Sequence, residues 1–166
     1  MSQPWRRLAV SRAAAAVEIS VNSTPGVPTR TRSPARTGAR SRTRAHPQPA
    51  GLDIVRKAAR TAVDKKGRQP LALDLRDLDG VCDYFLIVSG SSEVQVKAIA
   101  DAVQEKLREV GVRPWHVEGL EGRRWVLLDY VDLVVHVFHH RTREYYLLER
   151  LWGDARKVDL GLDPAD

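Results

Sequence analysis

The stretch YFLIVSGSSEVQVKAIADAVQEKLREVG, residues 84–111, decides the fold class. Its first seven residues, 84–90, form a nearly unbroken apolar run, which is typical of a central strand covered on both faces. From Ser92 onward the apolar residues recur at helical spacing, and Gly111 ends the pattern. Ser92 followed by Gln95 fits a capping box at the start of this helix. A buried strand that leads directly into an amphipathic helix indicates an α/β or mixed α+β domain.

Two elements precede this stretch in the chain. Residues 52–67 carry apolar side chains at helical spacing and end at Gly67 after a basic turn, which predicts a helix. Residues 70–75 predict a strand that is entered through Pro70. The sheet therefore gains at least one further strand on the N-terminal side.

Four elements follow the stretch. Residues 115–119, 124–130 and 133–140 predict three short strands, separated by glycine and aspartate. Residues 142–153 predict a closing helix, with Thr142 as its N-cap. The predicted order is helix, strand, strand, helix, three strands and a helix. This order gives one domain with a mixed sheet of about five strands and flanking helices.

Composition divides the chain into three parts. Residues 1–50 hold nine arginines, a single acid and many Pro, Ser and Thr residues, so we expect a disordered leader. Residues 51–153 are expected to form the domain, and residues 154–166 a flexible C-terminal tail. Three explanations of the leader remain open: an extension that contributes little, an organelle transit peptide and a nucleic-acid-binding arm.

The positive charge of the chain belongs to the leader. The whole chain has a net charge of +6, but residues 51–166 hold 18 basic and 20 acidic residues, a net of −2. Such a domain is expected to bind bare RNA poorly, and we expect no direct DNA binding. No apolar run approaches the ~18 residues of a membrane span. The single cysteine, Cys82, suits a reducing compartment, and we expect a cytoplasmic protein.

Three histidines, His136, His139 and His140, lie within five positions and raise the question of a metal site. On a strand, His136 and His140 are roughly 13 Å apart, too far for both to reach a zinc ion at about 2 Å. His139 points to the opposite face. We therefore expect no metal and no cofactor. His136 is interpreted as a core histidine with one hydrogen-bond partner, and the other two as polar residues where the strand leaves the sheet.

The Ser-Gly-Ser-Ser segment, residues 89–92, could suggest two enzyme classes. A Ser-His-Asp hydrolase would need a Gly-x-Ser-x-Gly elbow, which is missing. A metal-dependent nucleotidyltransferase also has Gly-Ser between a strand and a helix, but it needs two carboxylates at i, i+2 on the following strand. Asp77 and Asp79 have this spacing but precede Gly90 and are expected to lie in a turn. No catalytic residue is predicted, and the nucleotidyltransferase remains the rival hypothesis.

Several separated blocks between about Leu52 and Trp152 resemble one known family. In chain order they are Asp83-Tyr84-Phe85, Ser89-Gly90-Ser91-Ser92, Val96-Lys97-Ala98-Ile99-Ala100, Glu118-Gly119, Trp125, Asp129, Asp132, Val135-His136-Val137-Phe138, Arg143-Glu144-Tyr146 and Leu148-Glu149-Leu151-Trp152. This pattern is similar to that of the ribosomal silencing factors, also called Iojap-like proteins. Residues 1–50 lie outside the resemblance.

The resemblance implies a nucleotidyltransferase-like fold without catalytic carboxylates, in a protein that is not an enzyme. Such a protein would bind the large ribosomal subunit through the intersubunit-face protein numbered fourteen. It would block joining of the small subunit and repress translation when nutrients are scarce. Some family members are dimers, so a homodimer is possible.

The resemblance also places the partner contact on Trp125, Asp129 and Tyr130, as exposed aromatic and polar positions. From the residues alone, Trp125 fits a core position equally well, because tryptophans are usually largely buried. Strand alternation adds that positions 125 and 130 face opposite sides of a regular strand. Both can touch one partner only if Tyr130 lies in the turn that Asp129 to Asp132 are expected to form.

Overall fold

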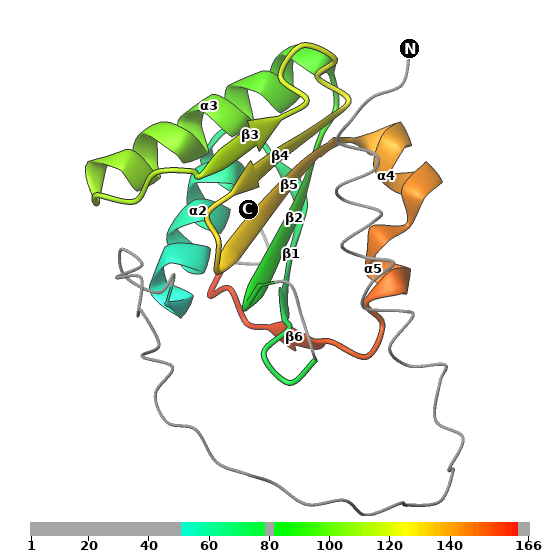
Figure 1. Ribbon diagram of the computed structural model, residues 1–166. Helices are drawn as coiled ribbons and strands as arrows, with labels where there is room; N and C mark the ends of the chain where they lie inside the picture. The colour runs from blue at the N-terminus through cyan, green and yellow to red at the C-terminus, as the bar shows by residue number, and fades with distance from the viewer. Residues whose placement is uncertain (1–50, 79–81, 163–166) are drawn as a thin grey trace, which may run out of the picture.

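The computed structural model describes residues 51–78 and 82–162, which form one sheet with helices on both sides (Figure 1). The predicted disordered leader, residues 1–50, lies outside the described residues. In chain order the elements are α2 (Leu52–Asp64), β1 (Arg68–Asp74), β2 (Tyr84–Gly90), α3 (Glu93–Glu109), β3 (His116–Glu118), β4 (Trp125–Asp129), β5 (Leu133–His139), α4 (His140–Tyr146), α5 (Leu148–Leu151) and β6 (Arg156–Val158). The predicted mixed α+β class is confirmed.

The strand order in the sheet is β3-β4-β5-β2-β1-β6. Strands β2 and β5 run parallel, whereas the other neighbouring pairs are antiparallel. Every residue of β2 is buried, as its unbroken apolar run predicted. Gly90 at the end of β2 lies opposite His139 at the end of β5, so the carboxyl ends of both strands meet at one end of the sheet. Helices α3 and α4 begin at this same end.

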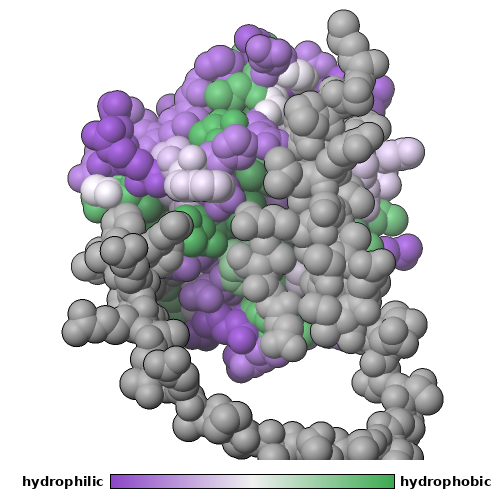
Figure 2. Space-filling model, in the orientation of Figure 1, coloured by the Kyte–Doolittle hydropathy of each residue, from purple (hydrophilic) through white to green (hydrophobic). Residues whose placement is uncertain are grey.

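Helices α2 and α3 pack against each other on one face of the sheet, and α4 and α5 lie on the other face (Figure 1). The inward side of α3 is fully buried, and each large aliphatic side chain buried in this way contributes about 1.5–3 kcal/mol. These residues are Val96, Ile99, Ala100, Val103 and Leu107. The outer surface around α3 is mostly hydrophilic, as an amphipathic helix requires (Figure 2).

Two core clusters lie on opposite faces of the sheet. The first core cluster fills the space under α2 and α3 and takes Val135 and Val137 from β5. The second core cluster lies on the α4 and α5 side of the sheet. It comprises Leu73, Leu75, Phe85, Ile87, Trp125, Val134, Phe138, Leu148 and Trp152. Successive residues of β5 thus alternate between the clusters, as period-two strand geometry dictates.

The sheet has six strands and not about five, because residues 156–158 form β6. This corrects the expected flexible tail, residues 154–166, over these positions. Strand β6 pairs antiparallel with β1, and Arg156 forms an ion pair of 2.8 Å with Asp77. Leu160 beyond the strand is also buried. A strand of three residues is too short to show an alternating sequence pattern. Residues 156–158 form a strand because they pair with the edge of β1.

The expected single closing helix, residues 142–153, is instead two short helices. Helix α4 begins directly after β5 with His139 as its N-cap, so Thr142 is not the cap. Leu147 adopts a left-handed conformation (φ 47°) that separates α4 from α5. This break buries Leu148 against the sheet while Leu147 itself stays 42% exposed.

The predicted cap of α3 is present with one change. The Ser92 hydroxyl accepts a hydrogen bond from the Gln95 amide at 3.2 Å, as a capping box requires. The Gln95 side chain reaches back to the amide of Ser91, at 2.7 Å, one residue earlier than in the standard box. Within residues 51–78 and 82–162, none of the helices combines the length and apolar character that crossing a membrane requires.

Candidate functional site

The structure buries His136 on β5, where it is 3% exposed and its ring centroid lies 4.8 Å from that of Phe85. The Trp125 indole donates a hydrogen bond to His136 Nδ1 at 3.2 Å, so the ring has the single partner that the sequence predicted. Burial lowers the pKa of His136 to about 3, which keeps the ring neutral at pH 7. Across the part of the chain that the structure describes, no three His, Cys, Asp or Glu side chains gather as a metal site would need.

The three predicted contact residues, Trp125, Asp129 and Tyr130, are all buried, at 3%, 6% and 7% exposure. Trp125 stacks on Phe138 with ring centroids 4.6 Å apart, within the second core cluster. Tyr130 belongs to the first core cluster, on the other face of the sheet. Burial raises the pKa of Tyr130 well above its usual range. The expectation that these side chains are exposed was therefore wrong, and the structure does not bring them to one surface. Their contact with a partner stays a prediction.

Asp129 nevertheless marks the edge of an exposed region. Its carboxylate accepts a hydrogen bond from the Val131 amide at 2.8 Å, and its backbone carbonyl accepts one from the Trp115 amide at 2.7 Å. Trp115 is 75% exposed and Val131 is 38% exposed. The sequence predicted Trp115 inside a strand of residues 115–119, but β3 begins one residue later, at His116. An exposed tryptophan thus lies beside the turn that follows β4.

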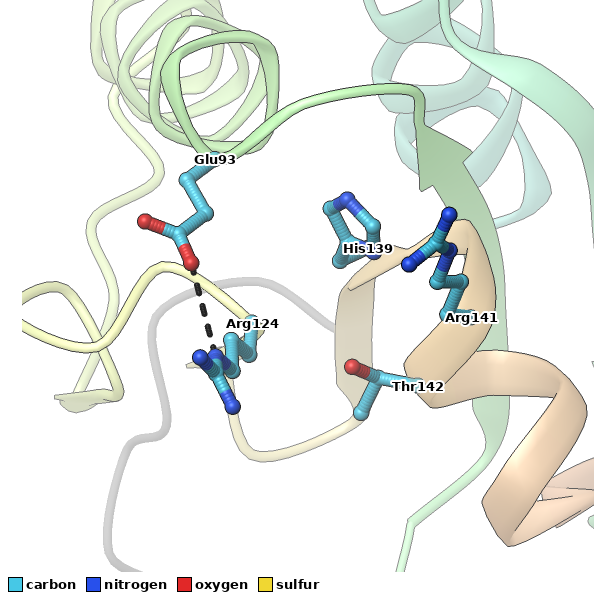
Figure 3. Close-up of a pocket in the computed structure, with 5 residues that line it drawn as sticks. All are labelled: Glu93, Arg124, His139, Arg141 and Thr142. Carbon is cyan, nitrogen blue, oxygen red and sulfur yellow. Dashed lines mark hydrogen bonds and ion pairs between the residues drawn. The ribbon is translucent and has the colours of Figure 1, made fainter.

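A pocket of about 320 Å³ opens at the end of the sheet where the carboxyl ends of β2 and β5 meet (Figure 3). It is lined by Glu93, Arg124, His139, Arg141 and Thr142. Glu93 begins α3, Arg124 precedes β4, His139 ends β5 and the last two residues belong to α4. The sequence did not predict this pocket, because its lining residues come from four separate segments that only the fold brings together.

The charges in this pocket are incompletely paired. Arg124 Nε lies 3.4 Å from Glu93 Oε1, a long contact between exposed side chains. No hydrogen bond or ion pair joins the Arg141 guanidinium to another described residue. Burial, followed by the charges of His140 and Arg141, lowers the pKa of His139. The lowered pKa favours the uncharged form of His139, so the two arginines dominate the local charge.

Ser89 and Ser91, the serines on either side of Gly90, form hydrogen bonds that stabilise the fold. Ser89 is buried, and its hydroxyl accepts a hydrogen bond from Arg143 Nη1 at 2.9 Å. The same Arg143 donates to Glu149 at 2.6 Å and to the Gln69 carbonyl at 2.8 Å, which ties α4 to β1 and β2. Ser91 contacts the Gln95 side chain at 2.7 Å. None of these partners is a histidine that could activate a serine for catalysis.

Comparison with known proteins decides the family. The profile described as "Ribosomal silencing factor during starvation" matches residues 48–165, well over half of the chain. The chain belongs to the ribosomal silencing factor family. The resemblance drawn from the separated sequence blocks is therefore confirmed.

Individual relatives of this family agree. The chain is 47% identical over 107 residues to "Ribosomal silencing factor RsfS" of Bacillus subtilis, a match that covers 64% of this chain and 91% of the relative. A crystal structure from Bacillus halodurans has 41% sequence identity and a TM-score of 0.58, covering 64% of this chain and 97% of that one. A structure from Chromobacterium violaceum has 38% identity and a TM-score of 0.60, covering 69% and 94%. The silencing factor fold is therefore that of the described domain.

Proposed function

We propose that this protein is a non-enzymatic repressor of translation that binds the large ribosomal subunit. It acts through the subunit's intersubunit-face protein numbered fourteen and sterically prevents the small subunit from joining. Membership of the silencing factor family carries this proposal, and the starvation named in the family's description supports a role when nutrients are scarce. In this proposal the protein works in the cytoplasm without a cofactor, a membrane or DNA.

The surface beside Asp129 is the proposed ribosome contact, defined here by Trp115, Val131 and the turn at Asp129. Among the tryptophans of the described residues, Trp115 is exposed, whereas Trp125 and Trp152 are buried. Aromatic side chains dominate binding hot spots because they bury a large area at low entropic cost. The net charge of −2 over residues 51–166 favours approach to a basic ribosomal protein.

Asp129 and Tyr130 are proposed to hold this surface in place from beneath. The Asp129 carboxylate fixes the Val131 amide, and Tyr130 anchors the turn in the first core cluster. Trp125 starts β4 on the opposite face, so its effect on binding is expected to follow from stability. A substitution at Asp129 releases the turn, whereas a substitution at Trp115 removes the exposed ring itself.

The rival hypothesis, a metal-dependent nucleotidyltransferase, needs two carboxylates at i, i+2 on a strand that follows Gly90. The strands that follow are β3 (HVE), β4 (WVLLD) and β5 (LVVHVFH), and none of them holds two acids. Asp77 pairs with Arg156 on the far strand β6. Incubation with labelled nucleoside triphosphates and magnesium tests this rival directly. Turnover that disappears on changing Asp77 or Asp79 would replace the silencing proposal with the enzymatic one.

Co-sedimentation with purified large subunits tests the proposed contact. We expect the unaltered protein to pellet with the subunits and Trp115→Ala to bind at least about 30-fold more weakly, the size of a 2 kcal/mol hot spot. Tyr145→Ala is the matched control, because Tyr145 is 78% exposed but lies on α4. Equal binding by the Trp115 variant and the unaltered protein would remove this surface from the proposal. A protein that never pellets with the subunits would remove the proposal itself.

A further inference from the structure

The pocket at the joined ends of β2 and β5 carries positive charge in a domain whose overall charge is negative. Arg124 and Arg141 each contribute one positive charge and Glu93 one negative charge, while the lowered pKa of His139 favours its uncharged form. The Thr142 hydroxyl adds a neutral donor on the same side as Arg141 (Figure 3). The local excess is therefore positive, whereas residues 51–166 together have a net charge of −2.

The donors of both arginines are largely available. A guanidinium has five N–H donors in a planar fork that matches phosphate oxygens. Arg124 has one contact, the 3.4 Å approach to Glu93, and side chains that are 74% and 52% exposed form only a weak pair. Arg141 pairs with none of the described residues. In Figure 3, Glu93 and Arg124 lie on one side of the open space and Thr142, His139 and Arg141 lie on the other, with the His139 ring between Arg141 and Glu93.

The position in the fold also favours an anion. Ligands of sheets with parallel strands bind outside the carboxyl ends of those strands, which is where β2 and β5 end. The 17-residue helix α3 begins at Glu93 and directs its partial positive charge toward this end of the sheet. The volume of about 320 Å³ falls at the lower end of the range for small-molecule sites, about 300–1,000 Å³.

We propose that this pocket binds the phosphate groups of a small polyphosphorylated ligand. Arg124 and Arg141 clamp the phosphates from two sides, and Thr142 donates a further hydrogen bond. Glu93 competes with the ligand for Arg124, so binding separates this pair. A small ligand fits better than a nucleic acid, because the confined volume and the acidic domain offer no extended basic track for a strand.

This site is independent of the proposed ribosome contact. Arg124 precedes the first residue of β4, whereas Trp115 lies beside Asp129, its last residue. At ~3.3 Å per residue, the length of β4 separates the two places by roughly 15 Å. A variant can therefore lose phosphate binding and keep ribosome binding, and another variant can lose ribosome binding and keep phosphate binding.

Amide NMR of the full-length protein, titrated with inorganic tripolyphosphate and separately with ATP without magnesium, tests the proposal. We expect saturable shifts at the amides of Glu93 and Thr142, a readout that is separate from the arginines of residues 1–50. Arg141→Ser and Arg124→Ser should each weaken binding about tenfold or more, the effect of losing a charged hydrogen-bonding partner. Glu93→Gln should tighten binding severalfold, because it removes the competing carboxylate.

Arg113→Ser is the matched control. Arg113 is an exposed arginine beyond the C-terminal end of α3, so the change removes the same charge far from the pocket. Absence of saturable shifts, or an equal loss of affinity in Arg113→Ser, would overturn the proposal. Shifts at the pocket amides that require a single-stranded RNA oligomer, with none from either small phosphate probe, would also overturn it in favour of nucleic acid.

Discussion

Replacing Trp125 by alanine should destabilise the domain strongly. Trp125 is 3% exposed, stacks 4.6 Å from Phe138 and lies 5.1 Å from the Tyr146 ring. Truncating a buried tryptophan to alanine costs roughly 3–5 kcal/mol through lost transfer energy and the remaining cavity. The change also leaves His136 Nδ1 without its 3.2 Å donor, and an unsatisfied buried acceptor adds about 1–3 kcal/mol. The total is a large fraction of the stability of an ordinary domain, about 5–15 kcal/mol.

Urea unfolding followed by far-ultraviolet circular dichroism measures this loss. Trp125→Phe separates the two contributions, because it keeps most of the ring packing and removes the indole donor to His136. We expect its cost to be well below that of alanine. Trp115→Ala is the control, because an exposed tryptophan should change stability by no more than about 0.5 kcal/mol. Unchanged unfolding of Trp125→Ala together with lost large-subunit binding would refute the core placement and return Trp125 to the contact surface.

Three further perturbations address other parts of the structure. The folded pKa of His136 is lowered to about 3, so the unfolded state binds the extra proton below its own pKa of about 6.5. The contribution of neutral His136 to stability is present above pH 6.5 and is lost as the pH falls toward 3. We therefore expect His136→Gln to flatten the dependence of the unfolding free energy on pH between pH 6.5 and 4. An unchanged pH dependence would count against a buried, neutral His136. Gly119→Ala should destabilise the domain by more than about 2 kcal/mol in urea unfolding. The φ of Gly119 is +83°, and a Cβ there would lie 2.0 Å from the Trp125 carbonyl oxygen. Gly111→Ala shares a φ of +80° but meets open space, so an equal cost at both sites would mean that the close approach is unimportant. A chain that begins at Gly51 should bind large subunits as well as the full chain does in co-sedimentation, and a large loss of affinity would revive the nucleic-acid-binding arm.

The strand and helix of residues 84–111 could be predicted because their local signals agree with the fold. The apolar run became β2, and the capped amphipathic pattern became α3. The alternation of β5 likewise predicted that His136 lies on the same face as Phe138, and their rings are stacked with centroids 6.2 Å apart. These elements are long enough for periodicity to be read. Strand β6 and the break at Leu147 have no such local signal. Strand β6 forms because it pairs with β1, and the helix breaks at Leu147 because Leu148 is buried against the sheet.

The candidate site was predicted less well. The alternation that put Trp125 and Tyr130 on opposite faces was correct, but it could not tell which faces were covered, and both proved to be covered. Trp115 was overlooked because a shift of one residue at the start of β3 decides whether it lies in the sheet or outside it. The arginines of the pocket lie 17 positions apart in sequence, at 124 and 141, and converge only through the pairing of β4 with β5.

Subunit association is the most direct test of the repressor role. Purified small and large subunits are mixed in the magnesium concentration that joins them, with and without an excess of this protein, and are separated on a sucrose gradient. We expect the joined ribosome peak to fall and the protein to migrate with the free large subunits. Tyr145→Ala should act like the unaltered protein, while Trp115→Ala should leave the peak largely intact. A joined peak of full height in the presence of excess unaltered protein would contradict the proposed repressor role.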